Sequence, residues 1–66
     1  MTVEEIKERV REIEQHAMDF EQAHALEDRL YADVLRAIAK GGHPWPAALA
    51  KAALETKAIK FARSCA

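Results

Sequence analysis

Every glycine and proline of this 66-residue chain lies within residues 41–46, so no helix-breaking residue interrupts the segments on either side. Gly41 and Gly42 are suited to end a helix, because glycine adopts a left-handed backbone without a steric penalty. Pro44 and Pro46 fix their own φ angles and favour extended geometry in the residues before them, and either can occupy the first turn of a following helix. The sequence therefore predicts helices on both sides of one rigid connector.

A first helix is predicted over residues 3–17. Thr2 and Glu5 have the spacing of a capping box, which places the helix start at about residue 3. Apolar residues then recur at alternating spacings of three and four, which gives one apolar seam on a charged helix. Such a seam requires a partner helix, and we predict that it binds a partner through Val3, Ile6, Val10 and Ile13.

A second helix is predicted over residues 19–40, with Asp19 as its N-cap and Gln22 at the third helical position. The apolar register shifts near residues 17–19, which favours a break there. A continuous helix over residues 3–40 is the alternative. The apolar residues of this second helix form a broad stripe expected to supply the core of the domain: Leu26, Leu30, Tyr31, Val34, Leu35 and Ile38.

A third, alanine-rich helix is predicted over residues 46–63, with Leu49, Leu54, Ile59 and Phe61 facing inward. The predicted fold is an all-α, three-helix domain, in which the second and third helices form an antiparallel hairpin. The first helix is expected to pack on this hairpin or on a second chain.

The length of the chain allows one domain, residues 1–66, with a small core. Fourteen of its residues are alanine, which contributes little buried apolar area, so self-association as a homodimer is expected. The single cysteine, Cys65, forms no intrachain disulfide and lacks an activating neighbour. With neither a signal peptide nor an apolar run long enough to span a bilayer, the expected location is the cytoplasm.

The second helix begins with a possible metal-binding face. Glu21 and His24 form an E-x-x-H pair, and Glu27 and Asp28 extend the same face, an arrangement that a dimer would double. The pattern is short and occurs often by chance, so an ordinary polar helix face is the favoured interpretation. In the antiparallel hairpin Arg63 returns to the level of these carboxylates, where it would meet Glu27 or Asp28, with Asp28 as the predicted partner.

Two further features suggest partners. Trp45, in the rigid connector, is a candidate partner anchor, although the shortness of the chain favours an indole folded back over the core. Four cations of the third helix suggest contacts with phosphates, but their spacing distributes them around the helix and indicates a solvated face: Lys51, Lys57, Lys60 and Arg63. Nucleic-acid binding is therefore the weakest alternative.

Three segments resemble small uncharacterised proteins of tailed phages and prophages: Phe20-Glu-Gln-Ala-His24-Ala-Leu-Glu27-Asp28-Arg-Leu30, Val34-Leu-Arg-Ala-Ile38-Ala39 and Leu54-Glu-Thr56-Lys-Ala-Ile59-Lys-Phe61-Ala-Arg63-Ser-Cys65-Ala66. The resemblance covers residues 19–66 and departs from the pattern at Met18 and Ser64. It implies a phage-encoded accessory protein and draws attention to seven positions: Glu21, His24, Glu27, Asp28, Thr56, Arg63 and Cys65.

These observations favour a non-enzymatic helical interaction module without a cofactor. The expected mode of action is association with itself or with a host protein in the host cytoplasm. A metal-binding dimer that uses the E-x-x-H face is the alternative.

Overall fold

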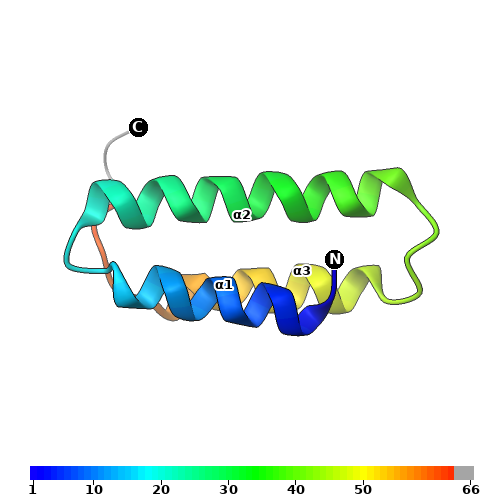
Figure 1. Ribbon diagram of the computed structural model, residues 1–66, viewed down its shortest axis with the longest axis horizontal. Coiled ribbons are helices and arrows are strands. Elements are labelled where there is room, and N and C mark those ends of the chain that lie inside the picture. The colour runs from blue at the N-terminus through cyan, green and yellow to red at the C-terminus, as the bar shows by residue number, and fades with distance from the viewer. Residues whose placement is uncertain (64–66) are drawn as a thin grey trace.

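The computed structural model describes residues 1–63 and contains three α-helices, as the sequence predicts (Figure 1). They are α1 (Val3–Gln15), α2 (Phe20–Lys40) and α3 (Pro46–Leu54), and a short 3₁₀ helix, η1 (Glu55–Ala58), follows α3 directly. No strand occurs within these 63 residues. The domain is therefore all-α.

The first two helices are separate, and each begins at the predicted cap. The Glu5 amide donates to Thr2 Oγ1 (3.1 Å), and the Thr2 amide donates to Glu5 Oε1 (2.7 Å), which completes the capping box. Helix α1 ends at Gln15, two residues before the predicted end, and Asp19 Oδ1 then accepts from the Gln22 amide (3.2 Å) to start α2. The predicted break is confirmed, and a continuous helix over residues 3–40 is wrong.

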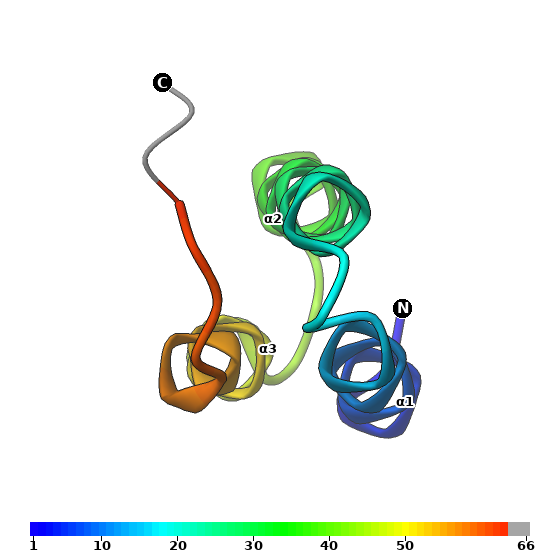
Figure 2. The same ribbon diagram turned by 90° about the vertical axis from the view of Figure 1, so that its left-hand side faces the viewer.

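The three helices pack side by side along their length. Figure 1 shows that the chain reverses direction between α1 and α2 and again between α2 and α3, and Figure 2 shows the helices at the corners of a triangle. The second reversal begins at Gly41 and Gly42, whose positive φ angles of 81° and 79° favour glycine at both positions. Helix α2 thereby contacts both of the others.

The apolar seam of α1 lies inside the chain rather than on a partner-binding surface. Ile6 and Ile13 are completely buried, and Val3 and Val10 pack against the core beside them. The prediction that these four residues bind a partner is therefore wrong, because α2 and α3 already cover the seam. The buried core draws on all three helices and on the segment after η1: Ile6, Ile13, Ala23, Leu30, Val34, Leu49, Ala52, Ala53 and Ile59.

The third helix is shorter than the predicted 46–63. Regular α-helix ends at Leu54, and the backbone leaves helical geometry at Ile59 (φ −79°, ψ 127°). A longer α-helix would use the carbonyls of Thr56 and Ile59 as acceptors for the amides four residues later. Here both carbonyls accept from the Arg63 guanidinium, at 2.9 and 3.1 Å, and the Thr56 carbonyl also accepts from the Ile59 amide at 3.0 Å, the three-residue spacing of a 3₁₀ turn. We call residues 59–63 the C-terminal strap.

The strap lies on the side of the bundle formed by α2 and α3. Figure 2 shows it in red, running from the end of η1 towards α2. Ile59 is buried in the core, and Phe61 packs against it. Within the described part of the chain, no helix is both long and apolar enough to cross a membrane.

Candidate functional site

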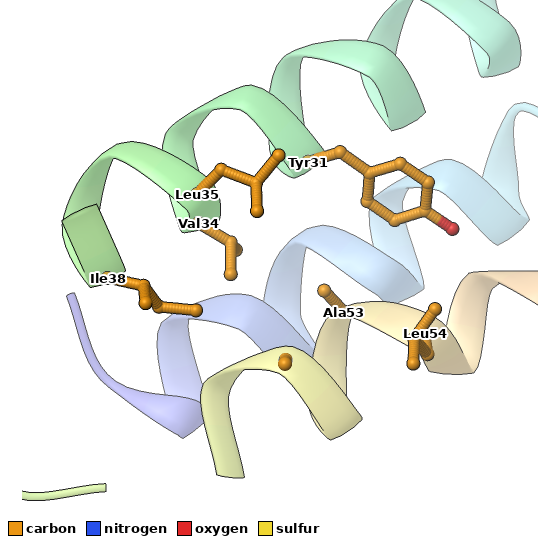
Figure 3. A pocket seen from close by; sticks show the side chains of 7 residues that line it. Tyr31, Val34, Leu35, Ile38, Ala53 and Leu54 are labelled. Carbon is orange, nitrogen blue, oxygen red and sulfur yellow. The ribbon is translucent and has the colours of Figure 1, made fainter. Parts of the chain in front are cut away.

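A hollow of about 250 Å³ lies between α2 and α3 (Figure 3). We call it the α2–α3 groove. Its lining consists of apolar side chains and one tyrosine: Tyr31, Val34, Leu35 and Ile38 from α2, and Ala50, Ala53 and Leu54 from α3. Helix α3 opposes the bulky residues of α2 largely with alanines, so the facing side chains leave space unfilled.

The rims of the groove carry exposed leucines. Leu35 on α2 is 65% exposed and Leu54 on α3 is 57% exposed, whereas Val34 and Ala53 are buried in the floor. Figure 3 shows the two leucines on opposite helices. The sequence interpretation placed both in the core and is wrong for both. Exposed apolar side chains around a hollow make this groove a candidate contact site for another molecule.

One end of the groove is fixed by polar contacts. The Tyr31 hydroxyl and Thr56 Oγ1 lie 2.5 Å apart in a hydrogen bond, which satisfies a threonine that is completely buried. Lys57 Nζ lies 5.7 Å from the centroid of the Tyr31 ring, within the range of a cation–π interaction. These contacts hold the tyrosine in place at the η1 end of the groove.

Beyond Tyr31, Arg63 of the strap forms an ion pair with Glu27 of α2. Arg63 Nε donates to Glu27 Oε1 (3.0 Å), and Nη2 donates to Oε2 (3.0 Å), a bidentate geometry. Glu27 is only 3% exposed. Asp28 was the predicted partner of Arg63, and this prediction is wrong. The carboxylate of Asp28 is exposed and lies 3.7 Å from His24 Nδ1.

The ion pair determines the charge state of Glu27. Burial by itself raises the pKa of this carboxyl. Two effects lower the pKa and together outweigh burial: hydrogen bonds from Arg63 and Thr56, and the positive charges of Arg63 and Lys57. The pKa of Glu27 therefore lies below its ordinary value. The carboxylate is ionised at neutral pH and serves as a structural acceptor.

The proposed metal ligands do not converge on one point. Glu27 is bound to Arg63, Asp28 is beside His24, and Glu21 is exposed in the first turn of α2. Among residues 1–63, no three histidine, cysteine, aspartate or glutamate side chains are grouped to hold a metal ion. The predicted site of Glu21, His24, Glu27 and Asp28 is therefore not formed within one chain.

The connector presents its tryptophan to solvent. Trp45 is 68% exposed at the N-cap of α3, so the interpretation that its indole folds over the core is wrong. Its backbone amide donates to His43 Nδ1 (2.9 Å), and His43 Nε2 is 3.1 Å from the Met1 carbonyl oxygen. The connector is thus tied to the start of the chain, with the indole left accessible.

The four cations considered for phosphate contacts do not share one surface. Lys51, Lys57 and Lys60 are exposed, whereas Arg63 is engaged with Glu27. Cys65, named by the resemblance, lies outside the described residues. Comparisons with known proteins gave no match to any family model, curated protein or solved structure.

Proposed function

We propose that this protein is a non-enzymatic protein–protein interaction module that binds its partner through the α2–α3 groove. The observation that carries the proposal is the pair of exposed leucines, Leu35 and Leu54, on either side of an apolar hollow. A partner helix or loop that fills the hollow would cover both side chains. Apolar grooves between two helices are a recurrent mode of protein recognition.

The energy available from this contact is appreciable. Complete burial of a leucine side chain is worth about 1.5–3 kcal/mol, and each of these two is more than half exposed. Covering both therefore contributes about 2 kcal/mol before any contact with the rest of the groove is counted. Trp45, an exposed residue of the type most enriched in interface hot spots, is a further anchor beside α3.

The polar side chains support a binding role over a catalytic one. Glu27, Thr56 and Arg63 are three of the positions named by the phage-protein resemblance, and all three take part in contacts that hold the strap. Their chemistry is therefore used to maintain the fold next to the groove. We propose a phage- or prophage-type accessory protein that acts on a host protein, on itself, or on both, in the host cytoplasm.

The proposal is tested by site-specific photo-crosslinking in the producing cell. A photoreactive side chain replaces Leu35 in one variant and Ala25, also exposed on α2, in a matched control. The expected result is a protein adduct from position 35 that is absent or much weaker from position 25. Equal labelling at both positions, or none at position 35, would refute the groove as a docking site.

A further inference from the structure

We propose that His43 is a pH-sensitive switch in the connector between α2 and α3. In its neutral form the imidazole joins the connector to Met1, and proton uptake at Nδ1 releases the backbone amide of Trp45. The inference goes beyond the proposed function and does not depend on the α2–α3 groove. It rests on the hydrogen bonds of the ring, on the contacts of the other two histidines and on the charges beside the connector.

Both ring nitrogens of His43 face backbone groups, and each group determines the protonation of the nitrogen that it meets. An amide N–H can only donate, so Nδ1, 2.9 Å from the Trp45 amide nitrogen, accepts and carries no proton. A carbonyl oxygen can only accept, so Nε2, 3.1 Å from the Met1 oxygen, carries the ring proton. The two contacts together specify the neutral imidazole with its proton on Nε2.

Proton uptake is incompatible with one of these two contacts. The added proton occupies Nδ1, which changes the acceptor into a donor and places two N–H groups against each other. The Met1 contact is kept, because Nε2 retains its proton. The loss falls on Trp45, the N-cap of α3, whose carbonyl accepts from the Leu49 amide at 3.2 Å. Protonation therefore changes the backbone that positions the exposed indole at the start of α3.

The other two histidines make contacts that a charged ring can keep. His16 Nδ1 lies 2.9 Å from the Glu12 carbonyl oxygen and must donate to it, which an imidazolium also does. His24 Nδ1 lies 3.7 Å from the Asp28 carboxylate, which attracts a charged ring. His43 is therefore the one histidine of the three whose hydrogen bond requires a neutral ring.

A hollow of about 490 Å³ lies beside His43 and is lined by charged side chains of α2. Two of them, Arg36 and Lys40, are cations. The third, Asp33, accepts hydrogen bonds from Arg9 at 2.9 Å and from Arg36 at 3.2 Å. Because this carboxylate already has two cationic partners, it does not replace the bond that a protonated His43 loses.

The charges on the α1 side of the ring are matched in the same way. The Met1 amine lies 3.9 Å from Glu5 Oε1, and this oxygen also accepts from the Thr2 amide at 2.7 Å. The Glu5 carboxylate is thus used by the capping box of α1. Neither carboxylate described beside the connector is therefore free to hold an imidazolium in the position of the neutral ring.

Close packing does not hold the connector in place of His43. Beyond their neighbours in the chain, no described atom lies within 4 Å of the position that a Cβ would take at Gly41 or Gly42. Pro44 and Trp45 are exposed. The position of this stretch therefore depends on the hydrogen bonds that His43 makes.

The test is NMR of the ¹⁵N-labelled full chain between pH 7.5 and pH 5.5, the range in which imidazole rings change charge. At pH 7.5 we expect the ¹⁵N shifts of His43 to show an unprotonated Nδ1 and a protonated Nε2. As the pH falls, we expect the Trp45 amide proton signal to move upfield as its hydrogen bond is lost. The fluorescence of Trp45, the single tryptophan, should change over the same range.

Two variants show whether His43 carries the response. In His43→Asn the side-chain oxygen can accept from the amide two residues on, as in an Asx turn, but it does not titrate. This variant should keep the Trp45 amide signal near its pH 7.5 position at both pH values. His16→Asn is the control, because His16 lies in the turn between α1 and α2, at the opposite end of the bundle from the connector (Figure 1). It should retain the full response of the wild type.

The inference is refuted by a protonated Nδ1 at pH 7.5, or by a Trp45 amide signal that does not move between the two pH values. A response that persists in His43→Asn, or that His16→Asn abolishes, refutes it as well. None of these results bears on crosslinking from position 35, so the proposed function is tested separately.

Discussion

Arg63 forms a bidentate ion pair with Glu27, which lies 36 residues earlier in the chain. Its two hydrogen bonds of 3.0 Å join the strap to α2. The same guanidinium donates to the carbonyls of Thr56 and Ile59 and lies 3.8 Å from the centroid of the Phe61 ring. With a further hydrogen bond to the Phe61 carbonyl at 3.5 Å, this one side chain donates to a buried carboxylate and to three backbone carbonyls, and it lies over an aromatic ring. This arrangement fixes the strap beside the groove.

Replacing Arg63 with alanine is expected to lower the free energy of unfolding by about 3 kcal/mol, because the buried Glu27 carboxylate would lose its partner. The measurement is urea denaturation followed by circular dichroism at neutral pH. Arg36→Ala is the control, since Arg36 forms an exposed pair with Asp33 whose loss should cost less than about 1 kcal/mol. Similar losses for the two variants would contradict the structural role of Arg63.

Stability is expected to fall as the pH drops below about 5. The pKa of Glu27 is lower in the folded chain than in the unfolded chain, where it is about 4.3. The unfolded state therefore binds the proton more readily, and the contribution of the ion pair is complete above the unfolded pKa and is lost as pH falls through the folded pKa. Unfolding in urea between pH 7 and pH 3 measures this loss.

The control for the pH experiment is Glu27→Gln, which has no carboxyl to titrate at this position. Its stability should be lower at pH 7 and should change less between pH 5 and pH 3 than that of the wild type. Some dependence should remain, because hydrogen bonding from Arg9 also lowers the pKa of Asp33. Identical pH profiles for the two proteins would show that Glu27 does not carry the effect.

Tyr31→Phe is expected to destabilise the fold by about 1 kcal/mol, since it leaves the completely buried Thr56 hydroxyl without its tyrosine partner. Thr56→Val and the double variant complete a double-mutant cycle in thermal or urea unfolding. The cycle should give a coupling energy of about 0.5 kcal/mol or more. Additive effects would contradict the hydrogen bond as an energetic link between α2 and η1.

The helices were predictable from local signals. The capping box at Thr2, the N-cap at Asp19 and the two glycines after α2 act within a few residues of their own position in the chain. The end of α3 was not predictable in this way. Residues 55–63 have helical composition, but the backbone leaves helical geometry at Ile59, and the carbonyls of Thr56 and Ile59 accept hydrogen bonds from the Arg63 guanidinium.

The candidate site was only partly predictable, because exposure depends on how helices pack around one another. The first-helix residues Ile6 and Ile13 form a seam that periodicity identifies, but periodicity does not say whether the covering helix belongs to the same chain. Leu35 and Leu54 are exposed on the two rims of the groove, and the alanines of α3 are too small to cover Leu35 on the facing helix. The sequence predicted that Arg63 would lie near Glu27 and Asp28. Which of these two carboxylates pairs with Arg63 depends on the rotation of α2 about its axis, and the apolar pattern does not determine that rotation closely enough.

Metal removal is expected to leave the fold unchanged. Since Glu27 is bound to Arg63 and Asp28 lies beside His24, a chelator should leave the melting temperature unchanged. His24→Ala should alter the free energy of unfolding by less than about 1 kcal/mol, because its charged neighbour is the exposed Asp28 at 3.7 Å. Thermal unfolding with chelator, and with added zinc, measures both. A melting temperature that rises with zinc concentration in the wild type but not in His24→Ala would show that the E-x-x-H face binds metal, because a ligand that binds only the folded state stabilises it by mass action.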